Sequence, residues 1–384
     1  MNFVSLILAL TIVAGQLIKI PVTENSGLTL LDIILVLLNL LGLYQIKFRL
    51  KKPPLYIKSA LIFTFVGTIS LSLTPLHLQS SEYIISFFYT VRFMSFVLFG
   101  WLIYSGAFAS FKNQTNNLLI YSGVGLSILG LLQFLFLPNL SFLTAQGWDP
   151  HYFRTVSTFL DPNFAGAYFV LTLLLIHCLD IPPFTKRAKW LFFAFVYLAL
   201  LTTFSRSSYL MFLVGGVLLS YFKKSKNLFT AVILLFSVLM AGFYLYTQLV
   251  ARPRNINREQ SASFRLNTWQ QGFTLFQNSP VLGVGFNAYR FALKEFKLGD
   301  EEFLKSHGAS SNDSSLLFVA STTGIIGLIS YLFFLGILIK AGWKQNFILT
   351  SALFGLIVHS FFANSLFYPP ILGWIILSAS APKK

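Results

Sequence analysis

The chain has 384 residues, of which 55% are hydrophobic and only 10% are charged, and its mean hydropathy is +0.72. A soluble domain carries about 25% charged residues, so this composition excludes an ordinary soluble protein. The formal net charge of +16 would indicate nucleic-acid binding in a soluble protein. In a membrane protein, lysines and arginines in the loops that set the topology account for such a charge. The one cysteine, Cys178, excludes a disulfide or cysteine-based metal framework.

Repeated apolar runs of about 20 residues predict transmembrane helices. The runs are continuous rather than alternating, so they predict a helix bundle and not a barrel. The first run lacks a basic start and a small-residue cleavage site, which indicates a retained helix rather than a signal peptide. The predicted fold class is therefore an all-α, polytopic membrane protein with about twelve transmembrane helices, at residues 3–17, 28–46, 56–73, 83–105, 117–137, 164–179, 190–203, 208–222, 229–249, 314–339, 347–362 and 366–378.

Lysines and arginines in the short connections predict the orientation in the membrane. The connections after the second, fourth, sixth, eighth and tenth predicted helices are basic, whereas the short odd-numbered ones carry few positive residues. Basic connections face the cytoplasm, so both termini are expected there. The chain then divides into helices one to nine at residues 1–249, a long extracytoplasmic loop with short amphipathic helices at residues 250–313, and helices ten to twelve with a cytoplasmic C-terminus at residues 314–384.

Three separate outer connections present Arg154, Arg206 and Arg265. A guanidinium binds phosphate oxygens bidentately and stays charged, so this pattern suits a doubly anionic ligand, although arginines also extend to lipid headgroups. Arg92 lies about eight residues into the fourth helix, roughly 12 Å from its outer end. A charge at that depth indicates a functional site, and an ion pair within the bundle is the alternative.

His307 precedes a small, polar run that leads into a helix start at Asn312 and Asp313. Such a helix terminus can bind an anion, and a nearby imidazole can act as a general base. His307 and His151, on the same side, can equally be surface histidines. Gly283 and Gly285 follow no strand and lack a third glycine at the spacing of a dinucleotide site, so they predict a tight turn. No cluster of metal ligands is evident.

Five segments, taken in order, carry a resemblance to a known family. They read RTVSTFLDPNFAG at residues 154–166, TFSRSS at 203–208, FRLNTW at 264–269, SPVLGVGFNAY at 279–289 and NDSSLLFVASTTGIIG at 312–327. With the long outer loop after the ninth helix, the chain resembles the O-antigen ligase and O-antigen polymerase superfamily of bacterial envelope proteins. The resemblance covers most of the chain.

The resemblance implies a GT-C-type bundle and a metal-independent, inverting glycosyltransferase without a cofactor. Such an enzyme takes a glycan from an undecaprenyl-pyrophosphate carrier and passes it to a lipid or glycan acceptor on the outer side of the bacterial cytoplasmic membrane. By matching motif positions, Arg206 and Arg265 would hold the pyrophosphate and stabilise it as the leaving group. Arg154 and Arg92 are further candidates for this pyrophosphate site. Membrane lipids are expected partners, and nucleic acid is not.

The chain departs from the family pattern before the tenth helix. Many members have His-Asn there, with the histidine proposed to activate the acceptor hydroxyl, but this chain has Ser311 and Asn312. Three alternatives follow: His307 is the base, Asp313 takes that role, or the chemistry differs. We favour His307. A transporter or lipid flippase would have internal repeats and polar groups near the midplane, and no clear repeat is present. A non-catalytic partner in envelope polysaccharide assembly is the third possible function.

Overall fold

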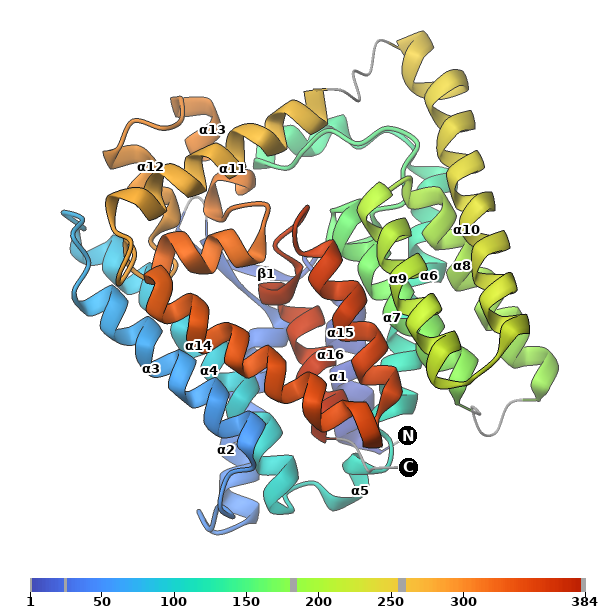
Figure 1. Ribbon diagram of the computed structural model, residues 1–384, viewed down its shortest axis with the longest axis horizontal. Coiled ribbons are helices and arrows are strands. Elements are labelled where there is room, and N and C mark those ends of the chain that lie inside the picture. The colour runs from blue at the N-terminus through green and yellow to red at the C-terminus, as the bar shows by residue number, and fades with distance from the viewer. Residues whose placement is uncertain (1, 24–25, 180–184, 255–259, 381–384) are drawn as a thin grey trace.

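The computed structural model describes residues 2–23, 26–179, 185–254 and 260–380. Each of the twelve apolar segments forms a helix in the structure, within a few residues of its expected ends (Figure 1). The helices are α1 (Phe3–Ala14), α2 (Leu30–Gln45), α3 (Leu55–Ser72), α4 (Ser80–Ser105), α6 (Thr115–Phe136), α7 (Pro162–Cys178), α8 (Lys186–Thr203), α9 (Arg206–Phe222), α10 (Lys226–Tyr246), α14 (Ser315–Gln345), α15 (Phe347–His359) and α16 (Pro369–Ser380).

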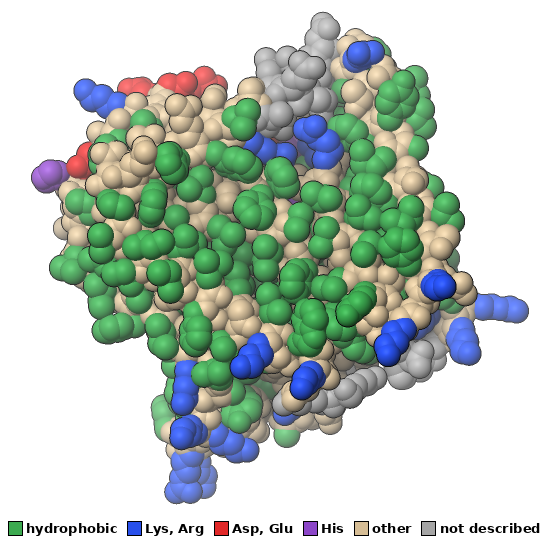
Figure 2. All heavy atoms as spheres, in the orientation of Figure 1, with side chains coloured by type: hydrophobic (Ala, Val, Ile, Leu, Met, Phe, Trp, Pro, Cys, Tyr) green, Lys and Arg blue, Asp and Glu red, His purple; other side chains and the backbone are tan. Residues whose placement is uncertain are grey.

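Five of these helices, α3, α4, α6, α10 and α14, are long and apolar enough to cross a membrane. The helices α1, α2, α7, α9, α15 and α16 are apolar but shorter, with 10–17 residues. Apolar side chains cover the broad middle of the face seen in Figure 2. The structure is thus consistent with an all-α membrane protein, and both twelve spans and a GT-C bundle stay predictions.

Shorter elements cover one end of the bundle. A hairpin that the sequence did not predict, β1 (Lys19–Thr23) with β2 (Ser26–Thr29), joins α1 to α2, and Lys19 pairs with Thr29 across it. The segment between α10 and α14 forms α11 (Gln260–Asn278), α12 (Tyr289–Glu295) and α13 (Glu301–Lys305), at the top of Figure 1. A short helix, α5 (Ala109–Lys112), lies near the opposite end. The three-part division of the chain stays a prediction.

The helix α7 lies at the centre of the bundle, packed against α6, α8, α9 and α15. Its residues from Ala165 to Ile176 are all buried, which is typical of a helix that is apolar on every side. Its N-cap is Asp161, whose Oδ1 accepts hydrogen bonds from the backbone N–H groups of Asn163 (2.6 Å) and Phe164 (3.0 Å). The start of this buried helix is therefore held by a carboxylate.

The predicted tight turn at Gly283 and Gly285 is present, with φ of +72° and +106°. The turn packs on α14 at Gly324, where the helical backbone is interrupted because this residue has φ of +63° and ψ of −165°. Near this interruption, the backbone carbonyls of residues 321 and 322 accept hydrogen bonds from the N–H groups of residues 284 and 285, both at 3.0 Å. In return, the N–H groups of residues 325 and 326 donate to the carbonyls of residues 280 and 281. This exchange fastens the segment before α12 to α14.

Gly283→Ala is expected to lower the melting temperature in detergent by several degrees. The new Cβ would overlap the backbone of residues 322 and 323, and the left-handed conformation alone costs roughly 1–3 kcal/mol. Gly336→Ala is the matched control, because Gly336 lies inside α14 with open space around it and alanine favours a helix. A melting temperature of the Gly283→Ala protein equal to that of the wild type would contradict this packing.

Candidate functional site

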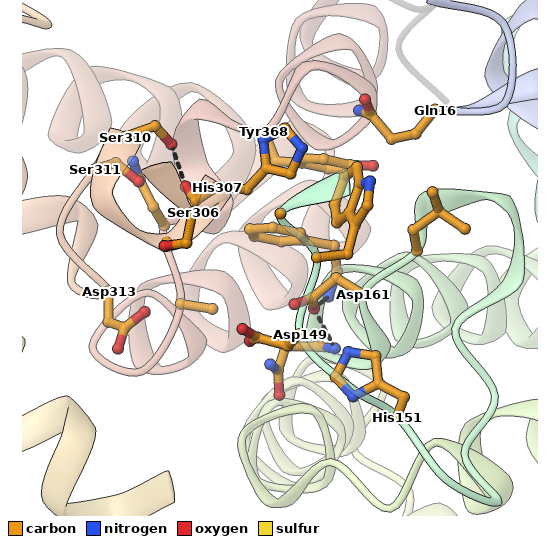
Figure 3. A pocket seen from close by; sticks show the side chains of 18 of the residues that line it. Gln16, Asp149, His151, Asp161, Ser306, His307, Ser310, Ser311, Asp313 and Tyr368 are labelled. Carbon is orange, nitrogen blue, oxygen red and sulfur yellow. Dashed lines mark hydrogen bonds between the residues drawn. The ribbon is translucent and has the colours of Figure 1, made fainter. Parts of the chain in front are cut away.

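All six residues predicted as site residues line one cavity of about 990 Å³. They come from five parts of the chain: α4, the connection before α7, the start of α9, α11 and the connection before α14. The residues are Arg92, Arg154, Arg206, Arg265, His307 and Asp313. Figure 3 shows His307, Asp313, Asp149 and Asp161 around this cavity. The fold therefore gathers polar residues that are far apart in the sequence.

Arg206 is the first residue of α9 and is exposed to the cavity. The preceding turn places Phe204 at φ of +48°, and the Ser205 side chain caps α9 by accepting from the N–H of Ser208. The guanidinium carbon of Arg206 lies 5.5 Å from the ring centroid of Phe243 in α10, a cation–π contact. Among the described residues, Arg206 has no acidic side chain within ion-pair distance. Its charge is therefore available to a ligand.

Arg265 lies in α11, half-buried, and its charge repels that of Arg206. Asp313 and Asp161 attract Arg265 electrostatically, but within the described part of the chain no acid reaches ion-pair distance of it. Two guanidinium groups that repel each other across a cavity favour an anion between them. We call Arg206 and Arg265 the arginine pair.

Arg154 is buried and holds the turn that carries Arg206. Its Nε donates to the carbonyl oxygen of Thr203 (2.9 Å) and its Nη2 to that of Phe204 (3.4 Å). The side chain therefore positions the start of α9 from the neighbouring connection. A direct contact of Arg154 with a phosphate stays a prediction.

Arg92 forms the ion pair that was the alternative to a functional role. Its Nε and Nη2 donate to the two carboxylate oxygens of Asp32 in α2, each at 2.7 Å, and its guanidinium lies over the Tyr89 ring at 4.7 Å. The partner therefore comes from a helix other than that of Arg92. Because its charge is balanced, Arg92 is less suited than the arginine pair to a pyrophosphate, and that role stays a prediction.

His307 begins a short 3-10 turn before α14, outside the apolar helices. Its backbone N–H donates to the carbonyl oxygen of Gly147 (3.0 Å), and its ring lies 4.4 Å from the Trp148 ring centroid. Burial, followed by the charges of Lys19 and Arg290, lowers the pKa of His307 to about 4. The imidazole is therefore neutral near pH 7 and has a nitrogen lone pair that can accept a proton.

Asp313 lies just before Ser314, the N-cap of α14, and accepts a hydrogen bond from Thr268 of α11 (3.1 Å). Burial raises the pKa of Asp313 to about 6, and the charge of Arg265 opposes that shift. The neighbouring Asn312 is buried, and its amide donates to the Tyr289 hydroxyl (2.9 Å) and to the carbonyl oxygen of Thr268. These contacts hold α11 and α12 at the start of α14, so Asp313 has a defined position beside the arginine pair.

Sequence reasoning did not assign several other cavity residues to the site. Asp161 lies in the quoted segment at residues 154–166, just before the apolar run from residue 164, and that position was its signal. Lys19 comes from the unpredicted hairpin. The Tyr368 ring stacks on that of Phe164 at 4.2 Å, giving the cavity an aromatic wall. In the part of the chain that the structure describes, no three His, Cys, Asp or Glu residues are grouped so as to hold a metal ion.

A family model described as O-antigen ligase matches residues 190–332. The match runs from α8 into α14 and contains four of the six predicted site residues, Arg206, Arg265, His307 and Asp313. A search of curated proteins found no match to this chain. The resemblance seen in the sequence is thereby confirmed over residues 190–332, which are similar to the O-antigen ligase family.

Proposed function

We propose that this protein transfers a glycan from an undecaprenyl-pyrophosphate carrier to a lipid or glycan acceptor at the outer face of the bacterial cytoplasmic membrane. The observation that carries the proposal is the arginine pair, which faces a cavity of about 990 Å³ and has no ion-pair partner among the described residues. Two guanidinium groups match the charge and the oxygen geometry of a pyrophosphate.

The proposed reaction is a single displacement with inversion. An oxygen of the acceptor hydroxyl attacks C1 of the sugar, and the bond from C1 to the pyrophosphate oxygen breaks. The carrier pyrophosphate leaves with the electron pair, and a base takes the hydroxyl proton. Arg206 and Arg265 stabilise the negative charge that develops on the leaving group, which is the task a metal ion performs in other transferases. The proposed enzyme is therefore metal-independent.

His307 is the proposed base. In a single displacement, the base must lie across the sugar carbon from the leaving group. Asp313 has Arg265 as an electrostatic neighbour and receives a hydrogen bond from α11, so it lies on the side of the arginine pair. The charged neighbours of His307 are Lys19 and Arg290 instead. This separation supports His307 as the group that faces the acceptor.

The distribution of charge supports an extracytoplasmic cavity. Most of the lysine and arginine side chains visible in Figure 2 gather at the end of the molecule where both chain termini lie in Figure 1. The helices α11 to α13, next to the cavity, lie at the opposite end. By the positive-inside rule, the basic end faces the cytoplasm. We therefore propose cytoplasmic termini and an outer location for residues 250–313.

The proposal is tested by incubating the purified full chain with an undecaprenyl-pyrophosphate glycan, an acceptor and a chelator. The expected result is release of the carrier pyrophosphate at the same rate with and without EDTA. Release that stops with EDTA and returns with Mg²⁺ would contradict metal independence. Passage of the lipid-linked glycan across a vesicle bilayer without release would assign a flippase instead. If purified protein neither releases nor moves it, a non-catalytic partner is the function that fits.

A further inference from the structure

The hairpin between α1 and α2 brings Lys19 to the cavity wall. Lys19 is half-buried, and its stem packs over Gly27, where an added Cβ would lie 2.7 Å from the Lys19 Cε. The backbone pairing of Lys19 with Thr29, another cavity residue, sets the start of the stem. The ammonium group is therefore held at the cavity by the hairpin and is not a free surface lysine.

The charges around Lys19 are unbalanced. Its electrostatic neighbours are the cations Arg92 and Arg290 and the single carboxylate of Asp32, so three positive groups face one negative group, a net charge of +2. Asp32 already accepts from two guanidinium nitrogens of Arg92 and from the N–H and hydroxyl of Thr29. Among the described residues, the Lys19 ammonium makes neither an ion pair nor a hydrogen bond.

A partly desolvated cation is costly unless a counter-charge meets it. We infer that Lys19 binds an anionic group, a carboxylate or a phosphate, on the acceptor glycan, beside His307 and apart from the arginine pair. That the bound molecule is the acceptor rests on the proposed function, because the base must touch the acceptor. That an anion binds at Lys19 rests only on the geometry of the hairpin and the net positive charge around Lys19.

Binding of this anion would also act on the base. Lys19 and Arg290 are the charges that lower the pKa of His307 toward 4, after burial. A negative group held by Lys19 would offset them and raise the pKa of His307, so its imidazole would become a stronger base when a charged acceptor is bound. A neutral acceptor would lack this effect. The site would then select acceptors that carry a negative charge next to the reacting hydroxyl.

The test is protection of the Lys19 amine from acylation in the purified full chain. The rate of acylation at Lys19 is followed by mass spectrometry in four solutions, which contain inorganic phosphate, glucuronate, glucose or chloride. The three salt solutions have equal ionic strength. Phosphate or glucuronate is expected to slow the reaction roughly ten-fold at saturation, because the bound anion occupies the ammonium group. The anion that protects at the lower concentration identifies the phosphate or the carboxylate as the group recognised. The exposed Lys224 is the control and should react at one rate throughout.

Equal rates at Lys19 in all four solutions would overturn the inference. The same measurement on the Arg206→Ala, Arg265→Ala double variant shows which site holds the anion: protection that persists supports Lys19, and protection that disappears assigns the anion to the arginine pair and overturns the inference. The outcomes are separate from the proposed function. Protection of Lys19 without glycan transfer would support the anion site and contradict the proposed transferase activity. Glycan transfer without protection of Lys19 would support the transferase activity and contradict the anion site.

Discussion

Replacing either arginine of the pair with alanine is expected to lower the rate of glycan transfer by ~10²–10³, the effect of losing one group that stabilises a leaving or attacking oxyanion. Arg206 and Arg265 come from different helices and face the same cavity without an ion-pair partner among the described residues, so neither can fully replace the other. Initial rates of carrier pyrophosphate release, measured with equal amounts of purified variant, check this result.

Two further variants sharpen that measurement. Arg206→Lys should restore only part of the activity, because an ammonium is a point charge and cannot bind two phosphate oxygens in a fork. Arg252→Ala is the matched control, since Arg252 is exposed beyond the end of α10 and its Nη1 donates a hydrogen bond to the side chain of Gln248 (2.7 Å). We expect Arg252→Ala to keep the wild-type rate within about two-fold, as is usual for surface substitutions. If both alanine variants of the pair kept the wild-type rate of pyrophosphate release, the proposal that the arginine pair binds the pyrophosphate would be wrong.

His307→Ala is expected to lower kcat/KM by ~10²–10⁴, the usual contribution of a general base. His77→Ala is the control, because His77 is an exposed histidine that pairs with Glu295 and lies outside the cavity. Asp313→Asn should have a smaller effect, since the carboxylate attracts Arg265 electrostatically and does not accept the proton in the proposed reaction. Equal rates in His307→Ala and wild type would remove His307 from the chemistry.

The pH profile separates the two candidate bases. A base accepts a proton only in its neutral imidazole or ionised carboxylate form, so activity is lost as the pH falls through its pKa. Burial and neighbouring cations place the pKa of His307 at about 4, and burial raises that of Asp313 to about 6. With His307 as the base, kcat/KM should stay level from pH 8 to pH 5. A fall near pH 6 that is absent in Asp313→Asn would assign the base to Asp313.

The helices were predictable because lipid requires continuous apolar segments with internally satisfied backbones. Some of the errors were at helix starts, where polar residues extend the helix beyond its apolar run. The run predicted from residue 190 begins at Lys186 after its cap Thr185, and the run predicted from residue 208 begins at Arg206 after Ser205. Arg206 is therefore the first residue of a helix and not a residue of a free turn.

The arginines and His307 were found from the sequence because charged residues are rare in this chain and stand out in the outer connections. Their contacts were not predictable. The bond of Arg154 to the turn before α9 and the pairing of Arg92 with Asp32 join segments that no local pattern relates. Sequence reasoning left the alternatives for Arg92 open, and the tertiary structure shows the ion pair.

The sequence by itself determined the class of protein, the positions of the helices and the resemblance to the O-antigen ligase and polymerase superfamily, and it named six titratable residues that line the cavity. Each of these follows from local properties: the length of apolar runs, the order of motifs and the scarcity of charge. Only the tertiary structure decided which of those charges are neutralised and which stay available, and it added Lys19 to the cavity through a hairpin with no signal in the sequence. Charge compensation depends on distances between segments, and packing of the helices sets those distances.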